Sequence, residues 1–472
     1  MPAPRFTIEA IRFFERDVAL RLPFRFGAAT VTACPQVYVH ARIRLEDGSS
    51  AEGCAAEMMI PKWFDKDPQL SNEDNFTQLR RALQAARSAY TSSADTHTAW
   101  GHFANHYADL MAAGERAGLN PLVTSYGPAL LDRALLDALC LRHDCSFARA
   151  MSDNLPGIAP AALAPDLQGF DFDAFAKAQQ PRQRIAARHT VGLADAIEEA
   201  EAATAGAVHD GLPTSLEGAI AHYGHTHFKL KLCGDTDADL RRLARIARLV
   251  DPVAELVTLD GNEQYQDAAA FGEFLDAFLA APALAGLAGK CAFIEQPIQR
   301  ATALQQDLGI ASARMPLLVD ESDSRIESFV EARTLGYCGV SSKSCKGFYK
   351  SAINAARCAQ AGPRAGLFLS GEDLTMQAGV GLQQDLALVG WLGLSHVERN
   401  GHHYVNGMAA LPEEEQKNFL RAHPDLYMHS AGAVRLRIEG GQIDLRSLLA
   451  EPGFGGTGKG GGIHWDAMRT EW

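Results

Sequence analysis

The sequence has few of the features that mark secreted or membrane-bound proteins. Nine cysteines are scattered among 472 residues without a CxxC pair, which argues against a disulfide framework. No apolar run is long enough to span a bilayer, and the first residues, MPAPRFTIEAIRFF, lack the pattern of a signal peptide. We therefore expect a cytoplasmic protein with no membrane partner.

Positive charge is also scarce. The formal net charge is −13, and the sequence contains no basic run, whereas nucleic-acid-binding proteins usually carry a basic stripe that displaces counterions from phosphates. We expect no nucleic-acid partner. What the chain does have is apolar mass, because 47% of its residues are hydrophobic and only 21% are charged. That composition predicts a large core and more than one domain.

The first third of the sequence predicts an α+β domain over residues 1–150. Residues 7–53 alternate between apolar and polar in the manner of strands, and Asp47-Gly48 is a hairpin turn signal. From about residue 70 to 150, apolar residues recur three and four apart, which is typical of amphipathic helices. Residues 165–182 are polar and indicate a connector or an insertion.

Residues 151–400 predict a barrel, because short apolar runs alternate there with helical patterns. The runs are RIAARHTVGL, THFKLKL, ELVTLD, CAFIE, PLLVD, YCGVSSK, AGLFLS and LGLSHVE. Eight strand-helix units is the number in a closed (β/α)8 barrel. An open doubly wound sheet is the competing fold, but no GxGxxG follows the first strand. Residues 401–472 are expected to pack back against the first domain.

Polar residues close the apolar runs, and in a parallel barrel the catalytic groups lie at these strand ends. In chain order they are Lys229 and Lys231, Asp260, Glu295, Asp320, and Lys343. Three acids that meet at a barrel mouth would repel one another unless a hard cation neutralises them, and oxygen ligands favour Mg²⁺, with Mn²⁺ as an alternative. The other interpretation is that each acid caps a helix.

The lysines suggest proton transfer. Lys229 and Lys231 are two residues apart on a strand, so both side chains leave the same face. Phe228, Leu230 and Leu232 take the other, apolar face, so the lysines are expected to point into the lumen. A buried amine beside another cation has a lowered pKa, so we interpret Lys231 as a base that Lys229 tunes. A lysine that merely pairs with a barrel carboxylate is the alternative. Lys343 lies four strands away around the ring, so the two amines would face a substrate from opposite sides.

The motifs FKLKL, LDGNEQY, IEQP, VDES and SSKSCK together resemble those of the enolase superfamily, in its muconate-lactonizing-enzyme subgroup, which includes dipeptide epimerases and o-succinylbenzoate synthases. The resemblance implies an α/β fold, an enolase-like modified TIM barrel with an α+β capping domain built from the N-terminal segment and the C-terminal tail. It also implies a Mg²⁺-dependent enzyme that removes a proton α to a carboxylate of a small molecule, and a homo-oligomer.

The resemblance assigns roles residue by residue. It makes Asp260, Glu295 and Asp320 metal ligands, Lys231 and Lys343 the acid/base pair, and Lys229 their helper. Asn262 and Glu321 would lie in a second shell. Residues 22–36, LPFRFGAATVTACPQ, occupy the place of the family's mobile cap loop.

Several positions depart from the family's pattern. Serines flank Lys343, so Lys346 is an alternative amine for the sixth strand. The seventh strand ends in LSGEDLT without the histidine of mandelate racemases, which leaves Ser370 or Glu372 as substrate contacts. No DxD closes the eighth strand, where the specificity candidates are His396, Glu398, His402 and His403. His225 and His227 form an HxH, but no third nitrogen or sulfur ligand lies at matching spacing, which argues against a zinc site there.

Two opposed amines favour a racemase or epimerase of a carboxylic acid or amino-acid derivative. A lyase (dehydratase) or a cycloisomerase needs only one amine for proton transfer and stays open. A Schiff-base aldolase and a non-catalytic binding protein on the same scaffold are less favoured alternatives.

Overall fold

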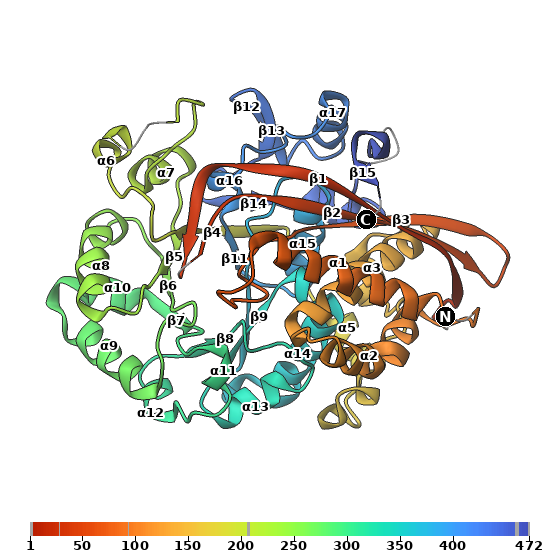
Figure 1. The fold of residues 1–472 in the computed structure, drawn as a ribbon, viewed down its shortest axis with the longest axis horizontal. Coiled ribbons are helices and arrows are strands. Elements are labelled where there is room, and N and C mark those ends of the chain that lie inside the picture. The colour runs from red at the N-terminus through yellow and green to blue at the C-terminus, as the bar shows by residue number, and fades with distance from the viewer. Residues whose placement is uncertain (1–2, 28, 93, 205–207, 458–461, 471–472) are drawn as a thin grey trace.

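The computed structural model describes residues 3–27, 29–92, 94–204, 208–457 and 462–470. These residues form a closed parallel barrel and an antiparallel sheet covered by helices (Figure 1). The predicted fold class, a modified TIM barrel with an α+β capping domain, is confirmed.

The capping domain begins with three long strands and contains a strand from the other end of the chain. Its sheet has the order β15-β1-β2-β3, with β1 (Phe6–Phe26), β2 (Ala29–Leu45), β3 (Ser50–Met58) and β15 (Arg469–Thr470). Arg44 pairs with Ser50 across the predicted turn, where Gly48 has φ +82°, a conformation that favours glycine. The sheet is covered by α1 (Asn72–Tyr90), α2 (Ala99–Arg116) and α3 (Pro121–Arg142).

Helix α3 packs on β3 so closely that one position of the strand must be glycine. A Cβ atom added at Gly53 would lie 2.2 Å from the Ala138 nitrogen and 2.4 Å from the Ala134 oxygen, both in the backbone of α3. Backbone atoms cannot move aside as a flexible side chain would. The helix and the sheet therefore depend on Gly53 for their contact.

Gly53→Ala should lower the free energy of unfolding by about 3 kcal/mol, because the added methyl group overlaps the α3 backbone. Gly272→Ala is the control, since a Cβ there meets nothing within 4 Å and alanine favours a helix by about 1 kcal/mol over glycine. Urea denaturation of both variants measures the difference. Equal stability of the two variants would contradict the close α3–β3 contact.

The barrel has eight parallel strands, and β11 pairs with β4 to close the ring. The strands are β4 (Arg184–Val191), β5 (His227–Lys231), β6 (Leu256–Asp260), β7 (Cys291–Glu295), β8 (Leu317–Val319), β9 (Gly339–Ser342), β10 (Phe368–Gly371) and β11 (His396–Arg399). Six of them lie within the predicted runs, and β10 and β11 each extend one residue beyond theirs, to Gly371 and Arg399. The helices that surround them are α6 (Glu199–Thr204), α7 (Leu216–Tyr223), α8 (Thr236–Val250), α9 (Ala268–Ala280), α10 (Ala285–Lys290), α11 (Arg300–Ala303), α12 (Gly309–Ser312), α13 (Ser328–Thr334), α14 (Phe348–Ala361) and α15 (Val380–Trp391).

The segments on either side of the barrel are structured. Before it lie α4 (Phe147–Ser152) and α5 (Phe172–Ala178), so part of the connector predicted over 165–182 is helical, with Asp171 as the N-cap of α5. After it come α16 (Gly401–Tyr404), α17 (Glu413–Ala422), β12 (Tyr427–Ser430), β13 (Ala433–Leu436), β14 (Gln442–Asp444) and α18 (Arg446–Ala450). Strand β14 pairs antiparallel with β4, and β15 pairs with β1.

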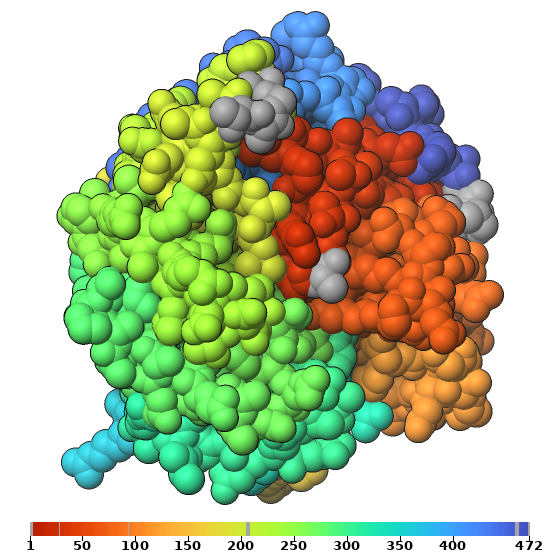
Figure 2. Space-filling model, turned by 60° about the vertical axis from the view of Figure 1, so that its left-hand side comes forward, coloured from red at the N-terminus to blue at the C-terminus, as the bar shows by residue number. Residues whose placement is uncertain are grey.

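The segment predicted as a cap loop over residues 22–36 is mostly strand. It forms the end of the β1–β2 hairpin, where Phe24 pairs with Val31. The hairpin reaches the barrel, because the Leu193 nitrogen, just after β4, donates a hydrogen bond to the Arg25 oxygen at 3.1 Å. Figure 2 shows the red N-terminal strands lodged between the yellow-green barrel segments and the orange helices. The hairpin therefore covers one side of the barrel mouth.

Among the helices in the described ranges, none is by itself long and apolar enough to cross a membrane, and only α9 taken together with residues 282–290, bent by 82°, meets the criterion.

Candidate active site

The KxK of β5 places two amines in the barrel lumen. Phe228, Leu230 and Leu232 pack in the apolar layer between strands and helices. Because side chains alternate along a strand, Lys229 and Lys231 point the other way, into the lumen. Both are buried, with exposed fractions of 1% and 6%.

Lys229 lies among four carboxylates. Its Nζ is 2.9 Å from Asp260 Oδ2, 2.7 Å from Glu295 Oε2, 2.8 Å from Glu372 Oε2 and 3.0 Å from Glu398 Oε2. Burial alone would lower the pKa of Lys229, but the four negative charges hold it well above its ordinary value. Lys229 is therefore a fixed cation at the centre of the lumen.

Lys229→Met should destabilise the barrel strongly, because it leaves four buried carboxylates without their shared counter-charge. We expect a loss of about 3–5 kcal/mol of unfolding free energy, the usual effect of breaking a buried ion pair. Urea denaturation in EDTA measures it, with Lys417→Met as the control, because Lys417 lies exposed in α17 and its ion pair with Glu413 is screened by solvent. Similar stability of the two variants would refute this role of Lys229.

Lys231 and Lys343 enter one small cavity from opposite sides of the ring. Lys231 ends β5 and Lys343 follows β9, four strands away in a ring of eight. The cavity has a volume of about 20 Å³, and both amines line it together with Lys229 and Asn262. Each amine is tied to an acid, with Lys231 Nζ 2.6 Å from Asp260 Oδ2 and Lys343 Nζ 2.6 Å from Asp320 Oδ2.

Apolar side chains of the capping domain form the roof of this cavity. Phe24 and Phe26 come from the β1–β2 hairpin, and Ile60 and Trp63 from the segment after β3. The Lys343 ammonium lies 4.2 Å from the centroid of the Trp63 ring, a cation–π contact. Such a roof excludes water, which strengthens every electrostatic interaction beneath it.

Lys346, the alternative amine, lies outside this cavity. Its Nζ contacts Asp323 Oδ2 at 2.9 Å, Ser341 Oγ at 2.6 Å and Asp320 Oδ1 at 3.3 Å. It lines a different cavity, beneath α2 and α3. Lys346 therefore binds Asp320 from outside the lumen cavity, whereas Lys343 faces the lumen.

The three acids lie at neighbouring strand ends. Asp260 pairs in register with Glu295, and Asp320 directly follows β8. The three acids are not close enough for one oxygen of each to lie within 4.8 Å of the others. In the described part of the chain, His189, His225 and His402 are the only three histidine, cysteine or acidic residues whose ligand atoms lie that close together. Each acid instead lies near a lysine. The Lys343 and Lys346 ammonium groups outweigh the effect of burial and hold the pKa of Asp320 well below its ordinary value.

Glu295 is the acid whose surroundings fit a bound cation best. Both of its carboxylate oxygens are buried, and no described residue donates a hydrogen bond to them, because the 2.7 Å contact with Lys229 lacks hydrogen-bond geometry. Burial and the charges of Asp260 and Glu372 raise its pKa well above the ordinary value. Buried, undonated oxygens among hard carboxylate ligands suit Mg²⁺.

Asn262 and Glu321 lie next to these acids. The Asn262 nitrogen donates to Asp260 Oδ1 at 2.8 Å, and its Nδ2 donates to Glu321 Oε1 at 3.2 Å. Asn262 has φ +40°, a backbone strain that such hydrogen bonds offset. From the capping domain, Lys66 Nζ donates to the Asn262 oxygen at 2.9 Å. The capping domain is thereby fixed to the turn that follows β6.

Ser370 and Glu372 also lie in the lumen and are held by an arginine that the pattern of strand ends did not indicate. Arg188 of β4 donates to Ser370 Oγ at 2.9 Å and to Glu372, while Thr190 donates to Glu398 Oε1 at 2.6 Å. Glu398, expected only as a specificity residue, is thus part of the charge network around Lys229. The alternation of side chains along RIAARHTV could have indicated that Arg188 points into the lumen, because Arg188 lies on the same face of the strand as Thr190.

Comparison with known proteins places this geometry in a family. The family model described as enolase C-terminal domain-like matches residues 212–457, just over half of the chain. No curated protein sequence matches.

Solved structures show the same fold. The muconate lactonizing enzyme of Pseudomonas fluorescens, complexed with muconolactone, has 18% identity and a TM-score of 0.60, with 98% of this chain and 99% of that chain covered. The dipeptide epimerase of Methylococcus capsulatus, complexed with Mg and a dipeptide, has 17% identity and a TM-score of 0.55, with 93% and 99% covered. A mandelate racemase/muconate lactonizing protein from Herpetosiphon aurantiacus has 18% identity and a TM-score of 0.59, with 95% and 97% covered. At these identities the likeness shows the fold alone, but together with the family match it establishes that the chain belongs to the enolase superfamily and is like its mandelate racemase/muconate lactonizing enzymes.

Proposed function

We propose that the chain is a Mg²⁺-dependent racemase or epimerase that removes the proton α to a carboxylate and returns one to the opposite face. The observation that carries this proposal is the position of Lys231 and Lys343, which line one cavity from opposite sides of the barrel. A carbon bound between two amines can lose a proton to one and receive a proton from the other.

In this proposal Lys231 and Lys343 have opposite protonation states. The amine that removes the proton is neutral, and the opposite amine is an ammonium that returns one. Asp260 and Asp320 each accept a hydrogen bond from one of them, so each ammonium has a counter-ion, and Lys229 adds fixed positive charge beside the reacting carboxylate. Lys343 is the sixth-strand amine, because Lys346 is bound to Asp320, Asp323 and Ser341.

Asp260, Glu295 and Asp320 are the residues that would hold Mg²⁺. The ion would supply the positive charge that stabilises the substrate carboxylate as its α-proton leaves. Asn262 and Glu321 orient the ligand on β6 through their hydrogen bonds. The apolar roof of Phe24, Phe26, Ile60 and Trp63 keeps water from the reacting carbon.

A lyase or cycloisomerase is the second candidate. The observation that favours it is the environment of Lys343, whose ammonium lies between Asp320 Oδ2 and the Trp63 ring. An amine held in this way suits a fixed electrostatic partner, with Lys231 alone moving the proton. A related structure is that of a 2-chloromuconate cycloisomerase from Rhodococcus opacus 1CP.

Incubation of acid sugars, N-acylamino acids and dipeptides in D₂O with Mg²⁺ tests the proposal. We expect deuterium to enter the α position of at least one compound, with inversion at that carbon, and we expect EDTA to stop it. The Lys231→Ala/Lys343→Ala double variant is the control for exchange by contaminants. Conversion without α-deuterium in the recovered substrate would support the lyase or cycloisomerase. Inactivation by borohydride in the presence of substrate, together with activity that EDTA does not reduce, would support an aldolase.

A further inference from the structure

A cluster of histidines lies on the other side of the barrel wall from the acids. Within β4, Arg188 and Thr190 reach the lumen, where they contact Glu372 and Glu398. His189 stands between them and therefore points outward, because side chains alternate along a strand. There it meets His225, from the turn before β5, and His402, from α16.

One ring nitrogen from each histidine converges on a common point. His402 Nε2 lies 3.3 Å from His189 Nδ1 and 3.1 Å from His225 Nε2, and one nitrogen of each ring is within 4.8 Å of the others. In a tetrahedral zinc site with Zn–N bonds of about 2.0–2.1 Å, neighbouring nitrogens are about 3.3 Å apart. Both measured distances are close to that spacing.

The hydrogen bonds around the cluster orient a lone pair inward. His225 Nδ1 lies 3.3 Å from the Ala187 oxygen, and a carbonyl oxygen only accepts, so this nitrogen carries the proton. His225 Nε2 then presents a lone pair to His402. A histidine that donates its distal N–H to a backbone carbonyl is the usual arrangement behind a metal-ligating nitrogen.

The cluster also contains a buried ring nitrogen to which the described residues offer no partner. His402 Nδ1 is buried and makes no hydrogen bond with any of them, so Nδ1 can carry the ring proton while Nε2, the nitrogen that faces His189 and His225, binds a ligand. Burial, together with repulsion between neighbouring imidazoles, holds the pKa of His189, His225 and His402 well below 6.5. Imidazole binds metals in its neutral form.

We infer that His189, His225 and His402 form a binding site for a divalent transition-metal ion of the Zn²⁺ class, separate from the acids at the barrel mouth. Imidazole nitrogen prefers Zn²⁺, Ni²⁺ or Cu²⁺, whereas the carboxylates prefer Mg²⁺. Of the two histidines in the HxH sequence, only His225 belongs to this site. His227 lies elsewhere, with its ring 5.6 Å from that of His396, and the other two ligands come from distant parts of the chain.

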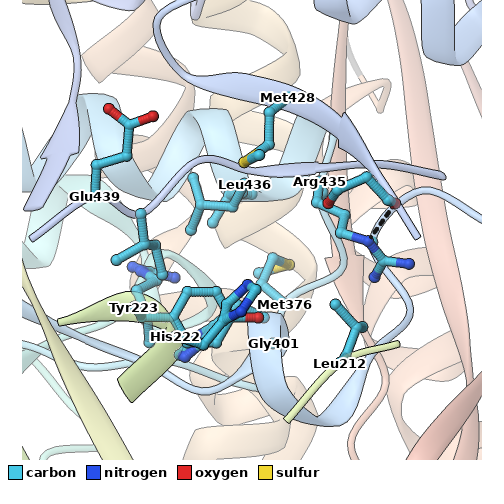
Figure 3. Close-up of a pocket in the computed structure, with 16 residues that line it drawn as sticks. Leu212, His222, Tyr223, Met376, Gly401, Met428, Arg435, Leu436 and Glu439 are labelled. Atoms are coloured by element: carbon cyan, nitrogen blue, oxygen red, sulfur yellow. Dashed lines mark hydrogen bonds between the residues drawn. The ribbon is translucent and has the colours of Figure 1, made fainter. Parts of the chain in front are cut away.

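Three protein ligands leave the fourth tetrahedral position for water or a small ligand. His402 lines a cavity of about 230 Å³, whose wall includes Tyr223 and His222. In Figure 3, these two side chains and Gly401 lie below Leu436 and Met428 in this cavity. The ion would also join β4, the turn before β5 and α16, and would thereby stabilise this part of the barrel. The inference does not depend on the proposed function.

Metal titration of the full-length protein tests the site. After EDTA treatment and transfer to excess Mg²⁺, which occupies the acids, Zn²⁺ is added and its affinity measured by competition with a chromogenic chelator. We expect one Zn²⁺ per chain, and an increase in Tm. His225→Gln and His402→Gln should each weaken binding by at least about tenfold, while the control His227→Gln should not.

Two further measurements distinguish a metal site from three histidines that only hydrogen-bond to one another. Co²⁺ bound to the wild-type protein should give the intense visible absorption of tetrahedral nitrogen coordination, which requires no folded variant. A Glu295→Gln/Asp320→Asn variant should retain the Zn²⁺, which places it away from the barrel mouth and keeps this result independent of the proposed racemase. Wild-type protein that binds no Zn²⁺ in excess Mg²⁺, or that gives only weak six-coordinate Co²⁺ absorption, would overturn the inference. So would equal affinity in His227→Gln and His402→Gln.

Discussion

Lys343→Ala is expected to lower kcat for racemisation by about 1,000-fold, and Lys231→Ala by a similar factor, because each removes one of the two groups that move the proton. Either loss is sufficient, since inversion needs an amine on each face. Substrate binding should change little, because in the proposed mechanism the substrate carboxylate would be held mainly by Mg²⁺. Steady-state kinetics on the substrate found by D₂O exchange measures both parameters.

Lys346→Ala is the matched comparison for Lys343→Ala. Both amines are buried and both contact Asp320, but only Lys343 lines the cavity at the barrel mouth. Lys346→Ala should therefore weaken Mg²⁺ binding and be rescued, at least in part, by more Mg²⁺. If Lys346→Ala abolished racemisation at saturating Mg²⁺ while Lys343→Ala did not, the sixth-strand assignment would be wrong.

Glu295→Gln is expected to act in opposite directions on activity and stability. Loss of one charged ligand should remove several kcal/mol of transition-state stabilisation, or about 1,000-fold in kcat/KM. In EDTA, however, the variant should unfold a few degrees above the wild type, because it removes one acid from a buried, mutually repelling group. Activity with and without Mg²⁺, and Tm in EDTA, provide the two measurements.

The control for this substitution is Glu255→Gln, an exposed position just before β6. Glu255→Gln should change neither the activity in Mg²⁺ nor the Tm in EDTA measurably. A Glu295→Gln variant that keeps wild-type activity in Mg²⁺, or that unfolds below the wild type in EDTA, would contradict the assignment of Glu295 as a ligand. The combined signature matters because a merely structural glutamate would lose stability under both conditions.

The features of this chain that depend on local periodicity could be predicted from its sequence. The strands β6, β7 and β8 are short apolar runs with an acid at or just after their ends, so the order of residues is enough to place Asp260, Glu295 and Asp320 at one edge of the barrel. Period-two alternation also places Lys229 and Lys231 on one face. The Asp47-Gly48 turn is equally local, because Gly48 supplies the positive φ that the hairpin needs.

Contacts across the ring could not be predicted in this way. Glu372 and Glu398 reach Lys229 from positions 143 and 169 residues further along the chain, and no spacing rule connects them. The expectation that Lys229 acts on Lys231 by charge repulsion took no account of these acids, which raise the pKa of Lys229. The histidine cluster could not be predicted for the same reason, since His189 and His402 are 213 residues apart in the sequence.

The conformation of a segment covered by another part of the chain could not be predicted either. Residues 22–36 were expected to be a cap loop on the resemblance alone, and they form the end of the β1–β2 hairpin. In the structure, Phe24 and Phe26 are buried at the barrel mouth, and that burial favours an ordered hairpin. Tertiary contacts decide the conformation here, as they often do for strands.

The stereochemistry of α-proton exchange in the single-lysine variants tests the central claim most directly. If Lys231 and Lys343 approach one carbon from its two faces, Lys231→Ala should wash deuterium into one enantiomer only and Lys343→Ala into the other only, and neither should racemise. Loss of exchange for both enantiomers in Lys231→Ala, with retention for both in Lys343→Ala, would contradict it.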